Sequence, residues 1–575
     1  MTTTRSGFTK LAAVCIAILL GAVVWELGWP LTRAEHEWSR LIAAVATLGH
    51  LTGILGSYFR KEINRPSLRL LIFQIISCLM IFLLIAREQQ EAGYMRFTEL
   101  SRLVITAGLI AIPTLMSLTR IFEWLVGKQK KGRPLMAPAM QFVASLGVVI
   151  LAGTGLLLLP NSTYPGITLS FTDALFTSTS AVCVTGLNAV DFAHTFTPLG
   201  EMFTLALIQI GGFGIMTFAY FVAMVAGQGF SLRDRVLLTD LLDEDNLGAV
   251  VSFITTIVVS TLFIELCGAV LLYFSWEGKD INLMGEPLWW HSLFHSVSAF
   301  CNAGFSTFPM NLMEPGIRLC YSGQAVIMAL IVCGGLGFGI YKEINSRLAN
   351  RFFSKHRRLH MQWTPYFKLV MISTGILLAG GALAIFAVSS PHAAEPLGEH
   401  LWICLFDSVT ARTAGFNISD YGRYLPAASL IMCGLMMVGG SPGGTAGGMR
   451  TTTCAIAGAE ILRILRGRDH VEFFRRRIDQ RTVARCVITV VVSCAWIGCF
   501  TVLICALEPS MSSLDIFFEN CSAFATVGVS RGITPDLSGP SKYLLIVNML
   551  AGRVGLFAFL IALAGTPTPR HYRYP

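Results

Sequence analysis

The sequence predicts an all-α integral membrane protein with four internal repeats, preceded by about four further transmembrane helices. Three observations lead to this fold class. Of its 575 residues, 54% are hydrophobic and only 13% are charged, whereas about a quarter of the residues in a soluble domain are charged. Many apolar segments reach the roughly 20 residues needed to cross a bilayer. Four similar stretches, each containing a glycine, recur along the chain at nearly constant spacing.

The apolar segments define the candidate transmembrane helices. Clear candidates are residues 8–29, 68–86, 135–159 and 250–274. The first apolar run is long and lacks a small-residue cleavage pattern, so we interpret it as a retained helix and not as a signal peptide.

Basic loops set the expected orientation of the chain. Lys and Arg concentrate in residues 59–69, 127–134, 342–360 and 463–481, and loops of this kind usually lie in the cytoplasm. The spans number about four before residue 132 and eight after it, an even total. We therefore expect a multi-pass protein of the cell membrane with both termini in the cytoplasm. The same loops account for the net charge of +9, so no nucleic-acid partner is predicted.

Cysteines and histidines suggest no metal centre or catalytic site. Most of the 15 cysteines lie in apolar segments, and no two have the C-x-x-C spacing, so we interpret them as small buried side chains. His291 and His295 have the i, i+4 spacing of a zinc pair, but no carboxylate of the HExxH type accompanies them. We expect hydrogen-bonded histidines there. No nucleophile, base and oxyanion group can be assembled, so no enzymatic activity is expected.

The four recurring stretches give the repeat its register. They read SAVCVTGL (180–187), SAFCNAGF (298–305), TARTAGF (410–416) and SAFATVGV (522–529). Their glycines are Gly186, Gly304, Gly415 and Gly528, which are 118, 111 and 113 residues apart. Each stretch follows a short apolar segment, at residues 171–181, 288–299, 400–411 and 514–523. These segments are too short to cross a bilayer, so we expect each to enter the membrane and turn back.

Four such re-entrant segments around one axis predict an ion pore with pseudo-fourfold symmetry. Non-helical backbone at membrane depth is tolerated where it is buried in protein or lines a wet cavity, and its carbonyls can replace the water shell of a cation. Glycine adopts left-handed backbone angles without steric penalty, which allows such a turn. The expected ion-binding residues are Cys183, Val184, Thr185, Gly186, Cys301, Asn302, Ala303, Gly304, Arg412, Thr413, Ala414, Gly415, Ala525, Thr526, Val527 and Gly528.

These stretches resemble the filter segments of the Trk/Ktr superfamily of potassium transporters, and the resemblance spans about residues 132–566. It implies potassium uptake, with K⁺ as the transported ion and no cofactor in this chain. All four glycine positions hold glycine, whereas family members with serine at the first tend to admit sodium. The resemblance also implies a homodimer in the lipid bilayer, bound to a cytosolic ring of nucleotide-binding regulatory subunits. Coupling of the flow to sodium or to protons stays open.

The repeat boundaries follow from this register. We expect N-terminal helices of unknown role in residues 1–131 and repeats at 132–228, 229–347, 348–467 and 468–575. The strands depart from the TVGYG sequence of tetrameric potassium channels. Arg412 is the largest departure, because a guanidinium facing the ions would repel them. We expect its side chain to point away from the pore and to pair with an acidic residue such as Glu519.

A glycine-rich break in the third repeat is the second informative feature. The stretch MMVGGSPGGTAGGMRTTT (436–453) lies in an apolar span and lacks the G-K-[ST] ending of a phosphate-binding loop. We expect a broken helix below the filter, and the resemblance implies that residues 439–449 act as a gate. The shorter glycine patches that begin at Gly211 and Gly334 are attributed to close helix packing alone. The expected gate residues are Gly439, Gly440, Ser441, Pro442, Gly443, Gly444, Thr445, Ala446, Gly447, Gly448, Arg450 and Arg553.

Arg553 is a charged residue inside an apolar span, where charged side chains normally face a cavity or a partner. We expect it to contact carbonyls of the loop between Gly439 and Gly448 and to hold the closed state. A secondary transporter with alternating access is the rival class, but its inverted repeats would give two halves of opposite topology. Here all four units run in the same direction.

Overall fold

The computed structural model describes scattered positions between residues 14 and 52, and then residues 138–214, 250–353, 363–389, 396–474 and 476–564. The chain divides into two compact units. The smaller comprises residues 1–135, 159–165 and 216–251; the larger comprises residues 136–158, 166–215 and 252–575. The predicted span 68–86 lies outside the described residues, and the span 8–29 is described only in part. Apart from the turn at residues 160–162 and from residues 250–251, everything below concerns the larger unit.

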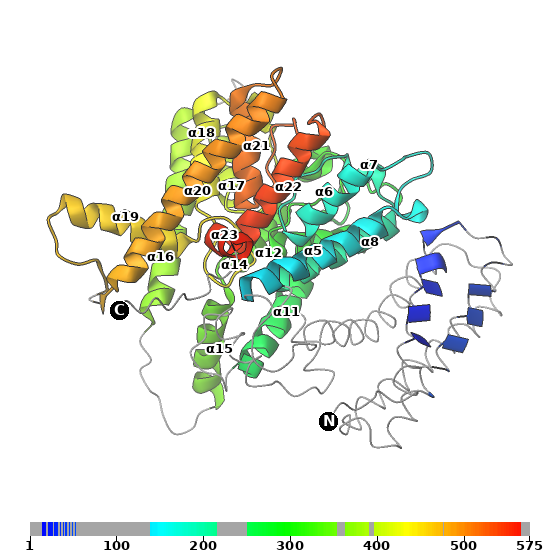
Figure 1. The fold of residues 1–575 in the computed structure, drawn as a ribbon, viewed down its shortest axis with the longest axis horizontal. Helices are drawn as coiled ribbons and strands as arrows, with labels where there is room; N and C mark the ends of the chain where they lie inside the picture. Colours follow the sequence, from blue (N-terminus) through cyan, green and yellow to red (C-terminus); the bar gives the residue numbers. More distant parts are fainter. Residues whose placement is uncertain are drawn as a thin grey trace, which may run out of the picture. The chain divides into compact units, whose positions relative to one another are not determined.

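Within the described residues, three helices are long and apolar enough to cross a membrane (Figure 1). They are α11 (Val250–Trp276), α16 (Pro365–Val388) and α20 (Gln480–Leu507). The prediction of a span at 250–274 is thereby confirmed. The candidate span 135–159 forms α5 (Pro138–Leu157). The described part of the chain is an all-α membrane protein.

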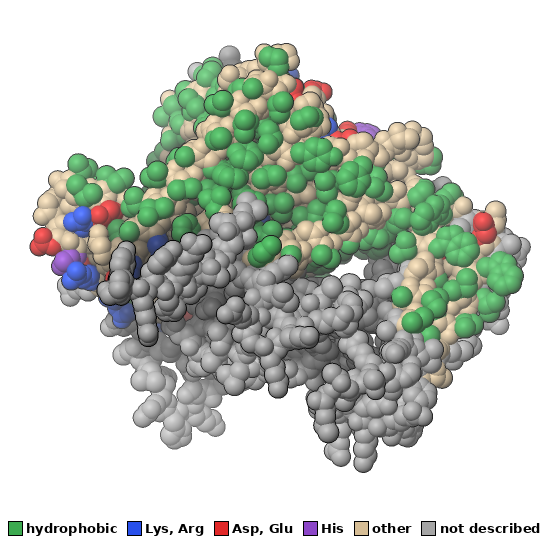
Figure 2. Space-filling view, viewed as in Figure 1, with side chains coloured by type: hydrophobic (Ala, Val, Ile, Leu, Met, Phe, Trp, Pro, Cys, Tyr) green, Lys and Arg blue, Asp and Glu red, His purple; other side chains and the backbone are tan. Residues whose placement is uncertain are grey.

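Large hydrophobic side chains cover the outside of these helices. Phe263 and Phe274 of α11 are each 67% exposed, and Val502 of α20 is 69% exposed. Figure 2 shows hydrophobic side chains spread over the visible face of the described helices, with few charged side chains among them. A surface of this kind is stable against lipid tails and not against water.

Four short helices lie between the longer ones. They are α6 (Phe171–Val182), α12 (Leu288–Cys301), α17 (Leu397–Thr410) and α21 (Ser513–Ala525), with 12 to 14 residues each. The start of α6 is fixed by the Ser170 side chain, which accepts a hydrogen bond from the Asp173 backbone N–H. At about 1.5 Å per residue these helices are shorter than the hydrocarbon layer, as the sequence predicts.

A second helix follows each short one, and in three of the four cases it continues beyond an interruption. The first is α8 (Pro198–Phe213), and the other three are α14 and α15 (Tyr321–Gly335, Phe338–Phe353), α18 and α19 (Pro426–Met437, Thr451–Leu465), and α22 and α23 (Gly539–Val554, Leu556–Ala564). Glycines with positive φ stand at the end of α8 and at two of the interruptions: Gly214 (76°), Gly337 (87°) and Gly555 (89°). The axes of α14 and α15 meet at a bend of 94°. The interpretation of the first two glycine patches as packing sites alone is therefore wrong, because α8 ends at one and α14 breaks at the other.

The helices pack in a closed cycle. Helix α8 packs on α12, α14 on α17, α18 on α21, and α22 returns to α6. The helix that follows each short helix thus packs on the next short helix along the chain, and the last packs on the first.

The remaining elements are small: α7 (Phe192–Thr195), α13 (Pro315–Arg318), the 3₁₀ turns at Pro160–Ser162, Asn311–Met313 and Tyr421–Arg423, and an antiparallel pair of two-residue strands, β1 (Glu472–Phe473) and β2 (Arg476–Arg477).

Candidate functional site

The four glycines of the recurring stretches meet at one place. A Cβ atom placed on Gly304 would lie 2.6 Å from the carbonyl oxygen of Ala414, and one on Gly415 would lie 2.6 Å from that of Val527. A Cβ on Gly186 would strike the Ala303 carbonyl, and one on Gly528 would strike the Thr185 carbonyl. Each glycine therefore touches the residue that precedes the next glycine, and the contacts close into a ring.

The backbone turns in the same way at each member of this ring. The glycines have φ angles of 92°, 68°, 82° and 89°, in chain order. Two residues before each glycine stands a non-glycine residue that is also left-handed: Val184 (56°), Asn302 (60°), Thr413 (75°) and Thr526 (50°). Left-handed backbone at residues with a side chain costs about 1–3 kcal/mol each and concentrates at functional sites. Four such residues at equivalent positions indicate that this part of the backbone is a candidate functional site.

Hydrogen bonds from the short helices hold these turns. The backbone N–H of Thr185 donates to Ser180 O, that of Ala303 to Ser298 O and that of Val527 to Ser522 O, at 2.7, 2.7 and 2.9 Å. The third stretch is one residue shorter, and there Ala414 N donates to Thr410 O at 3.0 Å. The hydroxyl groups at these four helix positions bond onward. Those of Ser180 and Ser522 accept from the glycine N–H, and those of Ser298 and Thr410 donate to the carbonyl after the glycine.

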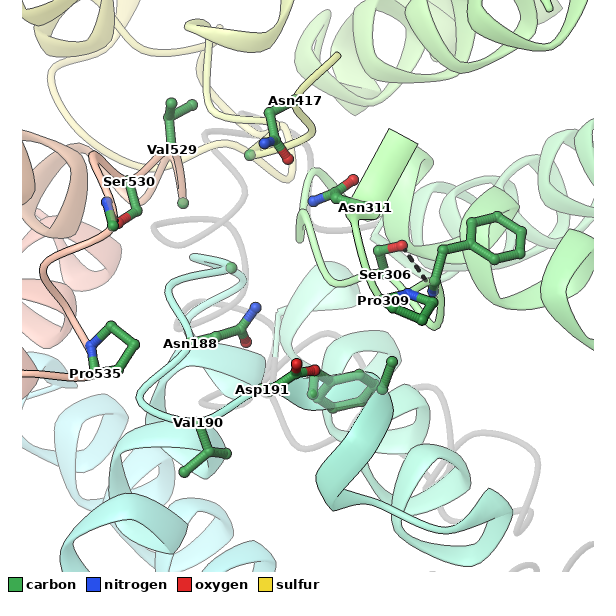
Figure 3. Close-up of a pocket in the computed structure, with 17 residues that line it drawn as sticks. Asn188, Val190, Asp191, Ser306, Pro309, Asn311, Asn417, Val529, Ser530 and Pro535 are labelled. Carbon is green, nitrogen blue, oxygen red and sulfur yellow. Dashed lines mark hydrogen bonds between the residues drawn. The ribbon is translucent and has the colours of Figure 1, made fainter. Parts of the chain in front are cut away.

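A cavity of about 320 Å³ opens on one side of the ring (Figure 3). Gly186, Gly415 and Gly528 line it together with polar side chains from the segments that follow the four stretches, including Asp191 and Asn311. Polar lining of this kind suits a hydrated ion about to lose water.

Arg412 does not pair with Glu519. Its guanidinium is 7% exposed and points to the start of α19, where Nη2 donates to Thr451 Oγ1 at 3.4 Å. Glu519 instead accepts hydrogen bonds from Ser530 and Thr534. The expected partner was wrong because sequence spacing cannot show that the serine and threonine of the same unit already occupy that carboxyl group.

The loop between α18 and α19 lies against the other side of the ring. A Cβ on Gly447 would strike the Thr526 side chain, and one on Gly448 would lie 3.1 Å from Ala525 Cα. Thr445 Oγ1 donates to Phe300 O, the carbonyl near the end of α12, at 3.3 Å. The expected break is confirmed, since α18 ends at Met437 and α19 begins at Thr451.

Backbone hydrogen bonds tie this loop to two neighbouring helix breaks. Ser441 N donates to Gly335 O at 3.0 Å, and Gly448 N donates to Gly552 O at 3.3 Å. Phe338 N donates in return to a loop carbonyl. Arg450 at the far end is exposed and caps no helix N–H with its side chain.

Arg553 bridges the loop and another helix end. Its Nη1 donates to Thr445 O and its Nη2 to Gly211 O, in α8. The contact with a loop carbonyl between residues 439 and 448 is the one expected from the sequence. The second contact, to α8, was not foreseen, because nothing in the sequence shows which helix faces Arg553.

Glycines of the interrupted helices allow close approach to the short helices. A Cβ on Gly211 would strike Val182 O, one on Gly334 would strike Phe300 O, and one on Gly552 would strike Phe524 O. These three carbonyls each lie four residues before a ring glycine. The packing role of these patches is thus present in addition to the helix breaks.

The remaining sequence interpretations have mixed outcomes. His291 and His295 are hydrogen-bonded as expected, to Thr307 Oγ1 (2.6 Å) and Ser306 Oγ (2.9 Å). Among the described cysteines, Cys183 and Cys301 are buried next to the ring. The expectation of burial is wrong for three others, which are exposed on α11 and α20: Cys267, Cys494 and Cys499. Thiols are apolar enough to face lipid, and apolar context alone does not separate the two environments.

A closed ring of left-handed backbone, with a cavity on one side and a glycine-rich loop on the other, is the candidate functional site of this membrane protein. The sequence matches the family described as "TrkH: Cation transport protein" over residues 105–574. The chain belongs to this family of cation transport proteins.

Individual relatives agree with this assignment. The chain is 34% identical to the Ktr system potassium uptake protein B of Bacillus subtilis, over 74% of this chain and 93% of that protein. It is 32% identical to the potassium/sodium uptake protein NtpJ of Enterococcus hirae, over 78% of this chain and 98% of that protein. The crystal structure of the potassium transporter TrkH from Vibrio parahaemolyticus has the same fold, with a TM-score of 0.59 and 18% identity, over 88% of this chain and 98% of that structure.

Proposed function

We propose that this chain takes up potassium ions across the cell membrane through one pore lined by the four ring stretches. The observation that carries the proposal is the mutual contact of Gly186, Gly304, Gly415 and Gly528, each against the residue before the next glycine. Carbonyls converging on one axis can replace the water shell of a cation. The names of the relatives, which are potassium uptake proteins, support the choice of ion.

In this proposal the chain forms four membrane–pore–membrane repeats with pseudo-fourfold symmetry, at residues 132–228, 229–347, 348–467 and 468–575. The cyclic packing of α8 on α12, α14 on α17, α18 on α21 and α22 on α6 supports it. The N-terminal helices expected in residues 1–131 lie mostly outside the described residues. The expected filter residues are those from 183 to 186, 301 to 304, 412 to 415 and 525 to 528.

Ion flow needs no catalytic chemistry. A negative cell interior contributes about 2.3 kcal/mol per charge for each 100 mV, which concentrates a monovalent cation roughly 50-fold. The chain then acts as a transporter and not as an enzyme, with K⁺ as its cargo. Sodium is a further candidate ion, as the name of one relative suggests.

We propose the loop of residues 439–449 as the gate. Its contacts beneath Ala525 and Thr526 support a position across the path of an ion leaving the ring. Arg553 holds the loop through Thr445 O, and the loop can leave only when this bond breaks.

The proposed assembly is a homodimer in the bilayer, with both termini in the cytoplasm and a ring of nucleotide-binding regulatory subunits docked from the cytosol. The basic loops at 342–360 and 463–481 are the proposed docking surfaces. The second carries the β1–β2 pair, which gives that loop a defined shape.

Uptake of potassium or rubidium in a bacterium without its own potassium importers tests the proposal. The native chain is expected to restore uptake and to prefer potassium over sodium. Gly186→Ser is expected to lose this preference, because the added side chain would strike the Ala303 carbonyl. Preference unaltered by Gly186→Ser, at equal amounts in the membrane, would count against the filter.

A further inference from the structure

A polar side chain of each short helix stands at an equivalent distance before the ring glycine. His295 and Glu519 lie nine residues before Gly304 and Gly528, and Thr177 lies nine residues before Gly186. In the shorter third stretch the counterpart is Asp407. Two residues after the glycines stand Asn188, Ser306, Asn417 and Ser530, all of which line the cavity above the ring (Figure 3).

In the fourth stretch these two positions are joined. Ser530 Oγ donates to Glu519 Oε1 at 2.5 Å and accepts from the Gly532 N–H at 2.8 Å. Glu519, only 1% exposed, also accepts from the Arg531 N–H and from Thr534 Oγ1, at 2.9 and 3.0 Å. The segment after the glycine is thereby fixed to the short helix α21.

In the second stretch the same two positions are joined by a hydrogen bond, with a histidine in place of the glutamate. His295 Nδ1 lies 2.8 Å from the His291 carbonyl, which can only accept, so Nδ1 carries the hydrogen. In the neutral ring, Nε2 then accepts from Ser306 Oγ at 2.9 Å. Ser306 Oγ also accepts from the Phe308 N–H at 3.1 Å. Both serines thus donate to the short helix and accept from the N–H two residues on; we name these two bonds, Ser306–His295 and Ser530–Glu519, the brace bonds.

The other two stretches lack a brace bond. Thr177 Oγ1 and Asn188 Oδ1 are both buried without a hydrogen-bond partner among the described residues. In the third stretch Asp407 accepts from Tyr421 OH at 2.9 Å and from Tyr424 OH, and not from Asn417.

The braced stretches are not neighbours in the ring. Because the glycine contacts run from the first stretch to the second, third and fourth and back to the first, the second and fourth lie opposite each other. Two facing walls of the ring therefore carry a bond to the short helix from the side chain two residues beyond the glycine, while the other two walls have no such bond at that position.

The structure assigns the hydroxyl groups of Ser306 and Ser530 to the discrimination between potassium and sodium, as positioning groups that keep two facing walls of the ring apart. This inference rests on the proposed function. Sodium is the smaller ion, so carbonyls must close further to replace its water shell. The brace bonds oppose this closure, because moving either wall inward would stretch a hydrogen bond that is buried at Ser306 and partly buried at Ser530.

The test compares rubidium and sodium uptake by the full-length chain in cells without their own potassium importers, at measured amounts of protein in the membrane. Ser306→Ala and Ser530→Ala are each expected to lower the rubidium-to-sodium uptake ratio by about threefold or more, the effect of losing one buried hydrogen bond. Ser530→Thr keeps the hydroxyl group and is expected to keep the ratio. Thr177→Val is the matched control, since it removes a hydroxyl at the equivalent helix position of an unbraced stretch; it is expected to leave the ratio unchanged.

The outcomes separate the inference from the proposed function. A native chain that takes up neither ion would contradict the proposed function. A native chain that prefers rubidium, with the same ratio in both alanine variants, would overturn the role of the braces and leave the function intact. A ratio lowered as much by Thr177→Val would also overturn it. If an alanine variant does not reach the membrane, thermal stabilisation of the purified variant by rubidium and by sodium decides, with a reduced difference expected.

Discussion

Replacing Gly415 by alanine tests whether the ring tolerates any side chain. Gly415 has a φ of 82°, and an added Cβ would lie 2.6 Å from Val527 O, 3.0 Å from Gly304 Cα and 3.3 Å from Gly528 Cα. The left-handed backbone costs an L-residue about 1–2 kcal/mol. The contact with Val527 O is shorter than an ordinary one by roughly 1 Å, and such overpacking costs about 1–3 kcal/mol more. The atoms involved belong to backbone that cannot rotate away.

These terms sum to about 2–5 kcal/mol, and every 1.4 kcal/mol is a factor of ten. We therefore expect Gly415→Ala to lower rubidium uptake at least about tenfold, measured as initial rates in cells without their own potassium importers. Gly166→Ala is the control: Gly166 has a φ of 89°, but nothing lies within 4 Å of an added Cβ. It incurs the backbone cost without the contact. Equal uptake by the two variants would refute the argument that the glycines are needed for close approach.

Three further predictions follow from contacts around the ring. Arg553→Ala removes the bond to the loop and is expected to raise open probability in single-channel recordings; an unchanged open probability would mean that the loop is held by its backbone bonds alone. Arg412→Gln, with Thr451→Val as its comparison, is expected to destabilise the start of α19, measured as faster hydrogen exchange there, and equal exchange in all three proteins would contradict the contact. Glu508, beyond the end of α20, accepts from Ser538 N–H (2.8 Å) and Ser541 Oγ (2.7 Å), which hold its pKa below the ordinary 4.5. Its stabilising effect is present above pH 4.5 and is lost as the pH falls through the lowered pKa, so Ser541→Ala should lower the Tm at pH 7 and lower it progressively less as the pH falls below 4.5.

The sequence is sufficient to predict features that depend on the composition and length of a single segment. Short apolar segments ending in glycine predicted α6, α12, α17 and α21, because length and composition limit what can cross a bilayer. The break between Met437 and Thr451 followed from six glycines and a proline in one span. Constant spacing suggested that the four glycines belong together, but only coordinates show that they touch.

Features that depend on long-range packing were missed. The pairing of Arg412 with Glu519 failed because the carboxyl group is occupied by hydroxyl groups of its own stretch. The contact of Arg553 with α8 joins residues 342 positions apart, and no local pattern encodes it. The end of α8 at Gly214 and the break at Gly337 lie in glycine patches that the sequence interprets as packing sites alone, since such patches serve both purposes and the sequence does not distinguish them.

Of the four left-handed residues before the glycines, only Asn302 could have been expected from its residue type. Asn302 is a residue type that tolerates this conformation, whereas Val184 is β-branched and normally avoids it. Its strain is imposed by the hydrogen bonds that hold the turn, which connect residues whose proximity arises only after the short helix has formed.

Locating the ions is the most direct test of the account. Crystals of the protein grown with rubidium or thallium would be measured for anomalous scattering. The account predicts peaks on a single axis enclosed by Gly186, Gly304, Gly415 and Gly528, at coordination distance from the carbonyl oxygens that precede them. Peaks bound elsewhere in the membrane region, with none inside the glycine ring, would contradict it.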